Sequence, residues 1–314
     1  MKILFELPTW IGDTVMTTPA IENFLSQFDN AMVTFIGPNI SIDIFRNHPK
    51  KDRLISLNKS YLDIYRISRR IGEFNYFISF RSSYRTVFLK KMVKAKNKFQ
   101  YSKNSYKIGH QVERYNNFIR DVLNIDKSPG NLKIYNTPDP KIKRKSLIGL
   151  NPGASYGSAK RWYPKEFAKV ATKLSKDFDI VILGSNNEIQ ISADIEKNLK
   201  KAKVKNFSNF AGQTSIPQLI DIISKLDIFV TGDSGPMHIA AAFQIPTVTI
   251  FGPTDFLTTC QWKNKFSTNV FKKLDCQPCM KRECPLIHHN CMKMIRAEDV
   301  IIEIEKLNES RISK

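Results

Sequence analysis

Short apolar runs alternate along the chain with stretches in which apolar residues recur at helical spacing. In the first half, the pattern predicts strands at 2–8, 31–37 and 76–80 and helices at 14–28, 60–71 and 114–123. A second succession follows, with predicted strands at 146–151, 180–184, 204–207, 228–232 and 247–251 and helices at 164–176, 188–200, 215–224 and 237–243. Because strands and helices alternate, we expect an α/β protein with two parallel, doubly wound sheets.

The domain boundary is predicted in residues 126–145, which are rich in Pro, Lys and Asn and contain no periodic element. We expect domains at 1–145 and 146–314, and the pattern leaves open whether the last helix returns to the first domain. No apolar run approaches the roughly 20 residues that span a bilayer. The start MKILFELPTW lacks the features of a signal peptide. These observations predict a soluble, cytoplasmic protein.

Positive charge is concentrated in the first half. The chain carries a net charge of +20, and residues 1–145 contribute +14 of it, with 26 Lys and Arg against 12 Asp and Glu. From Arg81 to Lys107 there are nine basic residues and no acidic one. Such a stretch would attract nucleic acid, an anionic membrane face or a phosphorylated ligand. The alternative is a solvated, lysine-rich surface.

The cysteines are crowded near the C-terminus, at 260, 276, 279, 284 and 291. An odd, clustered set does not suit a disulfide framework, so we expect thiols. The pattern Cys276-x2-Cys279-x4-Cys284-x6-Cys291, with two adjacent histidines, has the ligand density of a zinc site. Its irregular spacing favours reduced thiols or a redox-sensitive pair, and we predict no bound metal.

Ligands of parallel α/β sheets bind at the loops that follow strands and open helices. In the first such loop, Gly12 permits close backbone approach and Asp13 is a candidate general base, unless it only caps the helix. In the loop 151–162, the small residues around Ser155 expose backbone amides, and Lys160 or Arg161 can neutralise a leaving phosphate. This loop is not a Walker A motif.

Two later loops have similar chemistry. Glu188 can accept hydrogen bonds from ribose hydroxyls, although an acid at a helix start is the simpler interpretation. In Asp233–His238, Pro236 near the first helical turn and backbone donors from Ser234 onward suit a diphosphate. The alternative is a capping Asp or Ser, with His238 as a packed helix residue.

Several motifs together resemble one enzyme family. They are LPTWIGDTVMTTPAI, NPGASYGSAKRWYPKEFA, LGSNNE, FAGQTSIPQLIDII, TGDSGPMHIAAAFQIPTVTIFGPTD and CQPCMKRECPLIHHNCM. In this order they are similar to the bacterial ADP-heptose:lipopolysaccharide heptosyltransferases of glycosyltransferase family 9. The AKRW loop and the Cys-rich block are most similar to the type II branch.

The resemblance implies a GT-B fold, with two Rossmann-like domains facing a central cleft, and an inverting transfer of L-glycero-D-manno-heptose from ADP-heptose. The implied acceptor is phosphorylated heptosyl-Kdo-lipid A at the cytoplasmic face of the inner membrane. That membrane face is anionic, so it would attract the basic first half of the chain. Peripheral association with that face is therefore expected.

Individual roles follow from the same resemblance. Asp13 and Lys160 are the predicted catalytic residues, as base and as partner of the leaving diphosphate. Predicted contacts to the donor are Thr9, Gly12, Ser155, Lys160, Glu188, Asp233, Ser234, Gly235, Met237 and His238. Predicted contacts to the acceptor are Arg81, Arg85, Lys90 and Lys94. No cofactor or divalent metal is expected, because Lys160 and a helix dipole supply the needed charge.

Two alternatives remain open at this stage. One is a type I or type III enzyme of the same family, which differs in its acceptor. The other is a zinc-containing RNA-binding protein that uses the basic stretch with Phe88, Phe99 and Tyr101. No RRM, KH or OB signature accompanies the charge, so we expect no nucleic-acid partner.

Overall fold

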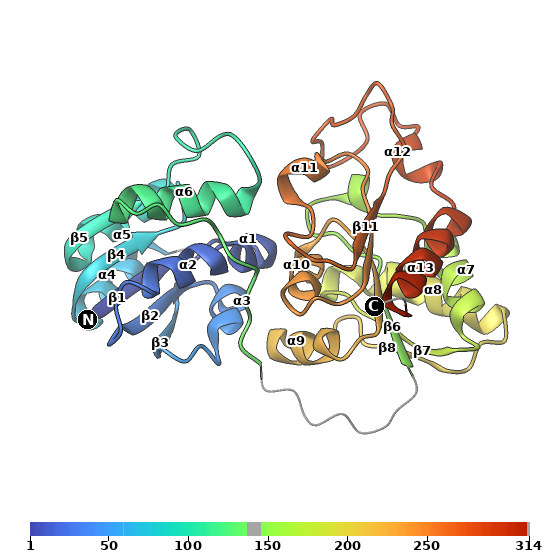
Figure 1. Ribbon diagram of the computed structural model, residues 1–314, viewed down its shortest axis with the longest axis horizontal. Helices are drawn as coiled ribbons and strands as arrows, with labels where there is room; N and C mark the ends of the chain where they lie inside the picture. The colour runs from blue at the N-terminus through green and yellow to red at the C-terminus, as the bar shows by residue number, and fades with distance from the viewer. Residues whose placement is uncertain (59, 137–145, 313–314) are drawn as a thin grey trace. The chain divides into compact units, whose positions relative to one another are not determined.

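The computed structural model describes residues 1–58, 60–136 and 146–312, with side chains to residue 309. The chain divides into two compact units, Met1–Asn136 and Thr137–Lys314 (Figure 1). The predicted boundary after residue 145 falls at the end of a segment, 137–145, that lies outside the described residues. Each unit contains one parallel sheet with helices on its faces.

The first unit is built on a five-stranded sheet of order β3-β2-β1-β4-β5. Its strands are β1 (Lys2–Glu6), β2 (Met32–Gly37), β3 (Lys51–Ser56), β4 (Glu73–Ser79) and β5 (Lys94–Gln100). Its helices are α1 (Ile11–Met16), α2 (Thr18–Leu25), α3 (Asn39–Ile42), η1 (Asp43–Phe45), α4 (Tyr61–Arg70), α5 (Tyr84–Met92) and α6 (Gln111–Leu123). Because the chain leaves β1 in one direction and returns to β4 on its other side, the loops after these two strands meet at the switch point.

The second unit is built on a six-stranded sheet of order β11-β10-β9-β6-β7-β8. Its strands are β6 (Ser146–Asn151), β7 (Phe178–Ile182), β8 (Phe207–Asn209), β9 (Ile228–Gly232), β10 (Thr247–Ile250) and β11 (Ser267–Val270). Its helices are η2 (Ser158–Lys160), α7 (Pro164–Leu174), η3 (Asn186–Glu188), α8 (Ile189–Lys201), α9 (Ile216–Ser224), α10 (Gly235–Ala242), α11 (Phe256–Thr259), α12 (Asn290–Lys293) and α13 (Ala297–Ile312). The switch point of this sheet lies between β6 and β9.

The predicted helix at 14–28 is two helices, with a break at Thr17. Pro19 lies at the start of α2 and has no N–H to donate to the Val15 carbonyl. The Thr18 hydroxyl donates to that carbonyl instead, at 2.7 Å. A threonine side chain thus replaces the missing backbone hydrogen bond, and a continuous helix is the wrong prediction.

Three strands were not predicted: β3, β5 and β11. Each of the three lies at an edge of its sheet, and β5 (KAKNKFQ) also carries polar residues at exposed positions. An edge strand is half solvated, so it lacks the apolar run that marks a buried parallel strand. The third predicted strand of the second half, 204–207, is also displaced, because β8 begins only at Phe207.

The predicted connecting segment is not entirely a linker. Leu132 and Ile134 are buried in the first unit. The Asn116 side chain donates to the Lys127 carbonyl at 2.7 Å, and the Lys133 amide donates to the Thr18 hydroxyl at 3.0 Å. Residues up to 136 therefore belong to the first unit.

The last helix, α13, does not return to the first unit. It packs against α7, β10 and β11 of the second unit. Val300 and Ile304 lie in the core of that unit. Among the helices of the described residues, none combines the length and apolar character needed to cross a bilayer.

Candidate functional site

Two of the predicted loops meet at the switch point of the second sheet. β6 and β9 are parallel neighbours, with Asn151 opposite Thr231 at their carboxyl ends. The Asn151 side-chain amide donates to the hydroxyls of Thr231 and Ser234, both at 3.0 Å. This amide fixes the start of the loop 151–160 against the loop that opens α10.

A buried ion pair forms where these loops meet. The Lys160 ammonium donates to Asp233 Oδ2 at 2.5 Å, and the Thr254 hydroxyl donates to the same oxygen at 2.7 Å. The side chains of Lys160 and Asp233 are only 12% and 7% exposed. Burying either charge alone would be costly, so each residue satisfies the other. The two predicted functional residues are therefore direct partners.

Lys160 is also held from its other side. Its ammonium lies 4.8 Å from the centre of the Tyr156 ring, a cation–π contact. The Tyr156 hydroxyl in turn donates to the Met280 carbonyl at 2.7 Å. These contacts hold the Lys160 side chain from two sides.

The start of α10 follows this ion pair. Ser234 is the residue before the helix, has extended backbone, and directs its hydroxyl to Asn151 and Thr231 rather than to the helix. Pro236 has no N–H, and the Met237 amide donates to the Ser234 carbonyl at 3.2 Å. His238 is 3% exposed and packs within the helix layer. The positive end of α10 lies beside the Lys160–Asp233 pair, but the Met237 amide is already used within the turn.

The remaining donor predictions of this unit lie on neighbouring loops. Ser155 is exposed in the loop after β6. Glu188 is buried and accepts a hydrogen bond from the Ser185 amide at 2.7 Å. A Cβ added to Gly153 would lie 2.0 Å from the Glu188 carboxyl carbon, so the Glu188 side chain would have to move to admit it. Glu188 thus has the structural role of a helix-start acid, and its contact to a ribose stays a prediction.

The Cys-rich segment, residues 276–291, packs on the loop that carries Lys160. The Ala159 amide donates to the Arg282 carbonyl at 3.0 Å, and His289 Nε2 lies 2.9 Å from the Ala159 carbonyl oxygen. A Cβ added to Gly157 would lie 2.2 Å from the Arg282 carbonyl oxygen. The sequence analysis treated this segment as a candidate metal site, as free thiols or as a family motif, and missed its support of the Lys160 loop.

The four clustered cysteines of this segment are thiols. Burial, together with the neighbouring thiols of Cys284, Cys276 and Cys279, raises the pKa of Cys291 to about 11. Within the described residues, no group of three or more His, Cys, Asp or Glu side chains is arranged to hold a metal ion. With a pKa of about 11, the Cys291 thiol is protonated at neutral pH.

In the first unit, Asp13 occupies the first turn of α1, while Trp10 precedes the helix as its cap residue. The Tyr115 hydroxyl, from α6, donates to Asp13 Oδ1 at 3.4 Å. Burial, and then the Asp13 charge, hold the pKa of Tyr115 well above its usual range. Tyr115 therefore stays protonated and remains a donor to this carboxylate. Thr9 is half-buried and Gly12 buried in the same strand-to-helix connection.

The four predicted acceptor residues are not brought together. Arg81 follows β4 and lies 3.7 Å from the Glu6 carboxylate, and Arg85 lies in the first turn of α5. Lys90 is in the last turn of α5, and Lys94 begins β5 and pairs with exposed Glu73 at 3.2 Å. Because β4 has seven residues, the two ends of the sheet are roughly 20 Å apart at about 3.3 Å per residue. Only Arg81 and Arg85 lie at the ligand-binding edge.

A buried carboxylate supports this edge. Glu6, at the end of β1, accepts hydrogen bonds from Ser79 at 2.7 Å and Thr86 at 3.1 Å. Burial raises the pKa of Glu6, while Ser79, Arg81 and Thr86 oppose that shift. The Glu6 carboxylate thus holds the Arg81 guanidinium in place through this ion pair. The sequence analysis did not predict this contact.

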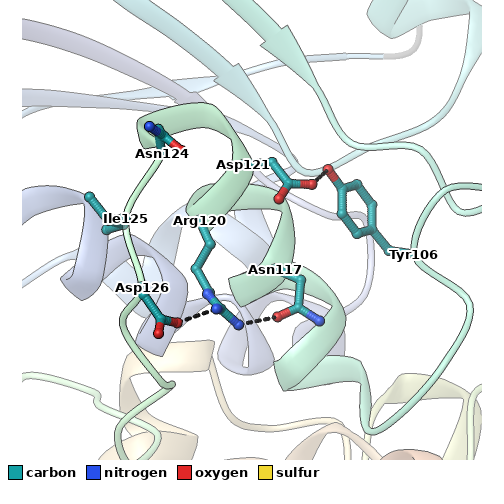
Figure 2. A pocket seen from close by; sticks show the side chains of 7 residues that line it. All are labelled: Tyr106, Asn117, Arg120, Asp121, Asn124, Ile125 and Asp126. Carbon is teal, nitrogen blue, oxygen red and sulfur yellow. Dashed lines mark hydrogen bonds and ion pairs between the residues drawn. The ribbon is translucent and has the colours of Figure 1, made fainter.

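A separate cavity of about 570 Å³ lies along α6 of the first unit (Figure 2). It is lined by Tyr106, Asn117, Arg120, Asp121, Asn124, Ile125 and Asp126. The Arg120 guanidinium pairs with Asp126, and the Tyr106 hydroxyl donates to Asp121 at 2.6 Å (Figure 2). These contacts tie the loop before α6 and the segment after it to the helix. None of the predicted site residues lines this cavity.

Comparison with known proteins identifies the family. Residues 77–289 match the model of "Glycosyltransferase family 9 (heptosyltransferase)". The chain is 38% identical to lipooligosaccharide heptosyltransferase 2 of Campylobacter jejuni, over 98% of both chains.

Solved structures agree in fold. The structure of Escherichia coli ADP-heptose lipopolysaccharide heptosyltransferase II aligns with a TM-score of 0.83 and 19% identity over 99% of each chain. E. coli heptosyltransferase WaaC with ADP aligns with a TM-score of 0.77 and 14% identity, over 98% of this chain and 100% of that one. The predicted GT-B class, with two Rossmann-like domains, is confirmed. The chain belongs to glycosyltransferase family 9, the heptosyltransferase family.

Proposed function

We propose that this protein transfers L-glycero-D-manno-heptose from ADP-heptose onto the heptosyl-Kdo-lipid A core of lipopolysaccharide or lipooligosaccharide. The observation that carries this proposal is the 38% identity to lipooligosaccharide heptosyltransferase 2 over 98% of both chains. The motifs around Lys160 and Asp233, which the tertiary structure brings into contact, provide the chemistry for an anionic sugar nucleotide.

The donor site is proposed at the switch point of the second sheet. Lys160 would share its charge between Asp233 and the leaving diphosphate, and the positive end of α10 would stabilise the same group through the amides of Ser234 and Gly235. Ser155 would bind a phosphate oxygen and Glu188 the adenosine ribose. Asp233 and His238 would orient the heptose or the loop itself. Thr9 and Gly12, in the connection from β1 to α1 of the first unit, stay predicted contacts to the donor.

The base is proposed to be Asp13. It would accept the proton of the acceptor hydroxyl as that oxygen attacks the anomeric carbon and ADP leaves from the opposite face. One displacement inverts the configuration. Tyr115 would hold the carboxylate in place through its hydrogen bond, since its raised pKa keeps it a donor.

The acceptor is proposed to bind through Arg81 and Arg85 at the edge of the first sheet. Guanidinium groups pair well with carboxylates and phosphates, which Kdo and lipid A carry. Lys90 and Lys94, at the other end of the sheet, would contribute to a general attraction rather than to the same contact. The enzyme would work at the cytoplasmic face of the inner membrane as a peripheral protein.

No divalent cation is proposed to take part. The Lys160 ammonium and the α10 dipole supply positive charge where the diphosphate leaves, which is the task of a bound metal in other transferases.

The test is a transfer assay with purified protein, ADP-heptose and a series of acceptors, following ADP release and product mass. Heptosyl-Kdo-lipid A should be converted and Kdo-lipid A should not. Transfer to Kdo-lipid A lacking heptose would indicate a type I enzyme and contradict the proposed acceptor. Transfer only to a core that already carries two heptoses would indicate type III.

A further inference from the structure

Large apolar side chains are exposed on the outer surface of α4 and α5 in the first unit. Leu62 is 67% exposed, Tyr61 and Tyr65 are each 50% exposed, Tyr84 is 91% exposed and Val87 is 41% exposed. On the opposite sides of the two helices, Ile64 and Leu89 are buried in the hydrophobic core of the unit. The core of this unit therefore does not use these exposed residues.

The exposed residues form one continuous surface. On α4, Tyr61 and Leu62 each neighbour Tyr65, at spacings of four and three residues. On α5, Tyr84, Val87 and Lys91 follow one another by three and four residues. The two helices lie side by side (Figure 1). The Tyr61 ring meets the Phe88 ring edge-on, with 5.3 Å between the ring centroids. We call this surface the α4–α5 face; its residues are Tyr61, Leu62, Tyr65, Arg66, Arg69, Arg70, Tyr84, Val87 and Lys91.

The charge of the α4–α5 face is positive. Arg66, Arg69, Arg70 and Lys91 are all exposed. The two helices contain one acidic residue, Asp63, which is half-buried and accepts a hydrogen bond from Asn58 at 3.4 Å. Aromatic, aliphatic and cationic side chains are therefore mixed on a surface almost without negative charge.

We propose that the α4–α5 face docks on an anionic phospholipid surface. Tyrosine rings are favoured at the headgroup level, aliphatic side chains gain by entering the acyl boundary, and each nearby Lys or Arg adds electrostatic attraction. Leu62 and Val87 favour lipid over nucleic acid, since single-stranded nucleic acid is bound by stacking on aromatic rings together with cations. The inference rests on the proposed function only in that the acceptor there is lipid-linked.

The experiment measures binding of the full-length protein to vesicles of phosphatidylcholine alone and of phosphatidylcholine with phosphatidylglycerol. The test variant is Arg66→Ser with Arg69→Ser. Its matched control is Lys197→Ser with Lys201→Ser, which removes the same charge from exposed positions near the end of α8. A second variant, Leu62→Ser with Tyr84→Ser, removes apolar groups while keeping the charge.

Wild type should bind the anionic vesicles, bind neutral vesicles weakly, and lose affinity as salt rises. The arginine variant should bind at least about tenfold more weakly, from about 1 kcal/mol per cation at the surface. The apolar variant should also weaken binding, and the α8 control should match wild type. All variants should transfer heptose to a water-soluble, deacylated acceptor as wild type does, with unchanged circular dichroism.

Equal binding to neutral and anionic vesicles, or equal weakening by the α8 control, would overturn the proposal. So would tighter binding of wild type to a single-stranded RNA than to anionic vesicles. Failure of wild type to transfer heptose to the soluble acceptor would instead contradict the proposed function, whatever the vesicle result.

Discussion

Lys160 and Asp233 are 73 residues apart in the sequence, yet the lysine ammonium lies 2.5 Å from the aspartate oxygen, and both side chains are almost fully buried. The pairing of β6 with β9 places them together. One residue therefore cannot be changed without leaving a buried charge on the other.

We expect Lys160→Met to lower both stability and activity. Removing one partner of a buried ion pair costs about 3–5 kcal/mol, because the remaining charge has no partner. Adding Asp233→Asn should recover most of the stability, measured by urea unfolding, while transfer stays low. If the double variant recovered transfer as well, Lys160 would be only a structural partner of Asp233.

Asp13→Asn should reduce turnover by about 10² to 10⁴, the usual loss on removing a general base, with binding of ADP-heptose retained. Steady-state turnover and donor binding by calorimetry measure the two effects separately. Asp52→Asn, an exposed aspartate of the same unit, serves as the control and should behave as wild type. Near-normal turnover of the Asp13 variant would show that Asp13 has only a structural role at the start of the helix.

Gly157→Ala should displace the Cys-rich segment from the Lys160 loop. The added Cβ would lie 2.2 Å from the Arg282 carbonyl oxygen, so the backbone must move. We expect a stability loss of about 1–3 kcal/mol, as for other overpacked positions, and weaker donor binding. At Gly130 an added Cβ meets nothing within 4 Å, so Gly130→Ala should leave both unchanged. Unaltered donor affinity in the Gly157 variant would show that the Cys-rich segment does not support donor binding.

Glu22 should contribute stability that depends on pH. Burial alone would raise its pKa, but hydrogen bonds from His48 and Tyr135 and the charge of Lys133 outweigh that effect and lower the pKa. A carboxyl with a lowered pKa in the folded state stabilises above its unfolded pKa, and this contribution is lost as pH falls through the folded pKa.

Accordingly, Glu22→Gln should be less stable than wild type at pH 7, and the difference should shrink as pH falls below about 4.3, the usual pKa of glutamate. Thermal unfolding across pH 3 to 7 measures this. Glu73→Gln, which removes an exposed ion pair with Lys94, should change stability by less than about 1 kcal/mol. A pH-independent loss in the Glu22 variant would contradict the electrostatic origin.

Extensive dialysis against a chelator should leave transfer unchanged, because Lys160 and the α10 dipole are proposed to carry the charge of the leaving diphosphate. ADP release with and without EDTA tests this directly. Recovery of lost activity by a single added divalent ion would contradict a metal-independent reaction.

Periodicity and local chemistry were enough to predict the alternation of strands and helices, the two parallel sheets and the loops around Asp13, Lys160 and Asp233. These features are local: a buried parallel strand needs an apolar run, and a helix that follows it needs an apolar stripe. Edge strands such as β3 and β5 were not predicted, because water solvates one side of them and they lack an apolar run.

Only the tertiary structure decided which distant residues meet. The strand order brings Lys160 and Asp233 into contact. It also separates the residues of the basic stretch, because Arg81 lies at the carboxyl ends of the strands and Lys94 at their amino ends. It also placed the Cys-rich segment against the Lys160 loop. A sequence lists residue types in order, but the free energy of burying a charge depends on its neighbours in space, and those neighbours are set by how the strands pair.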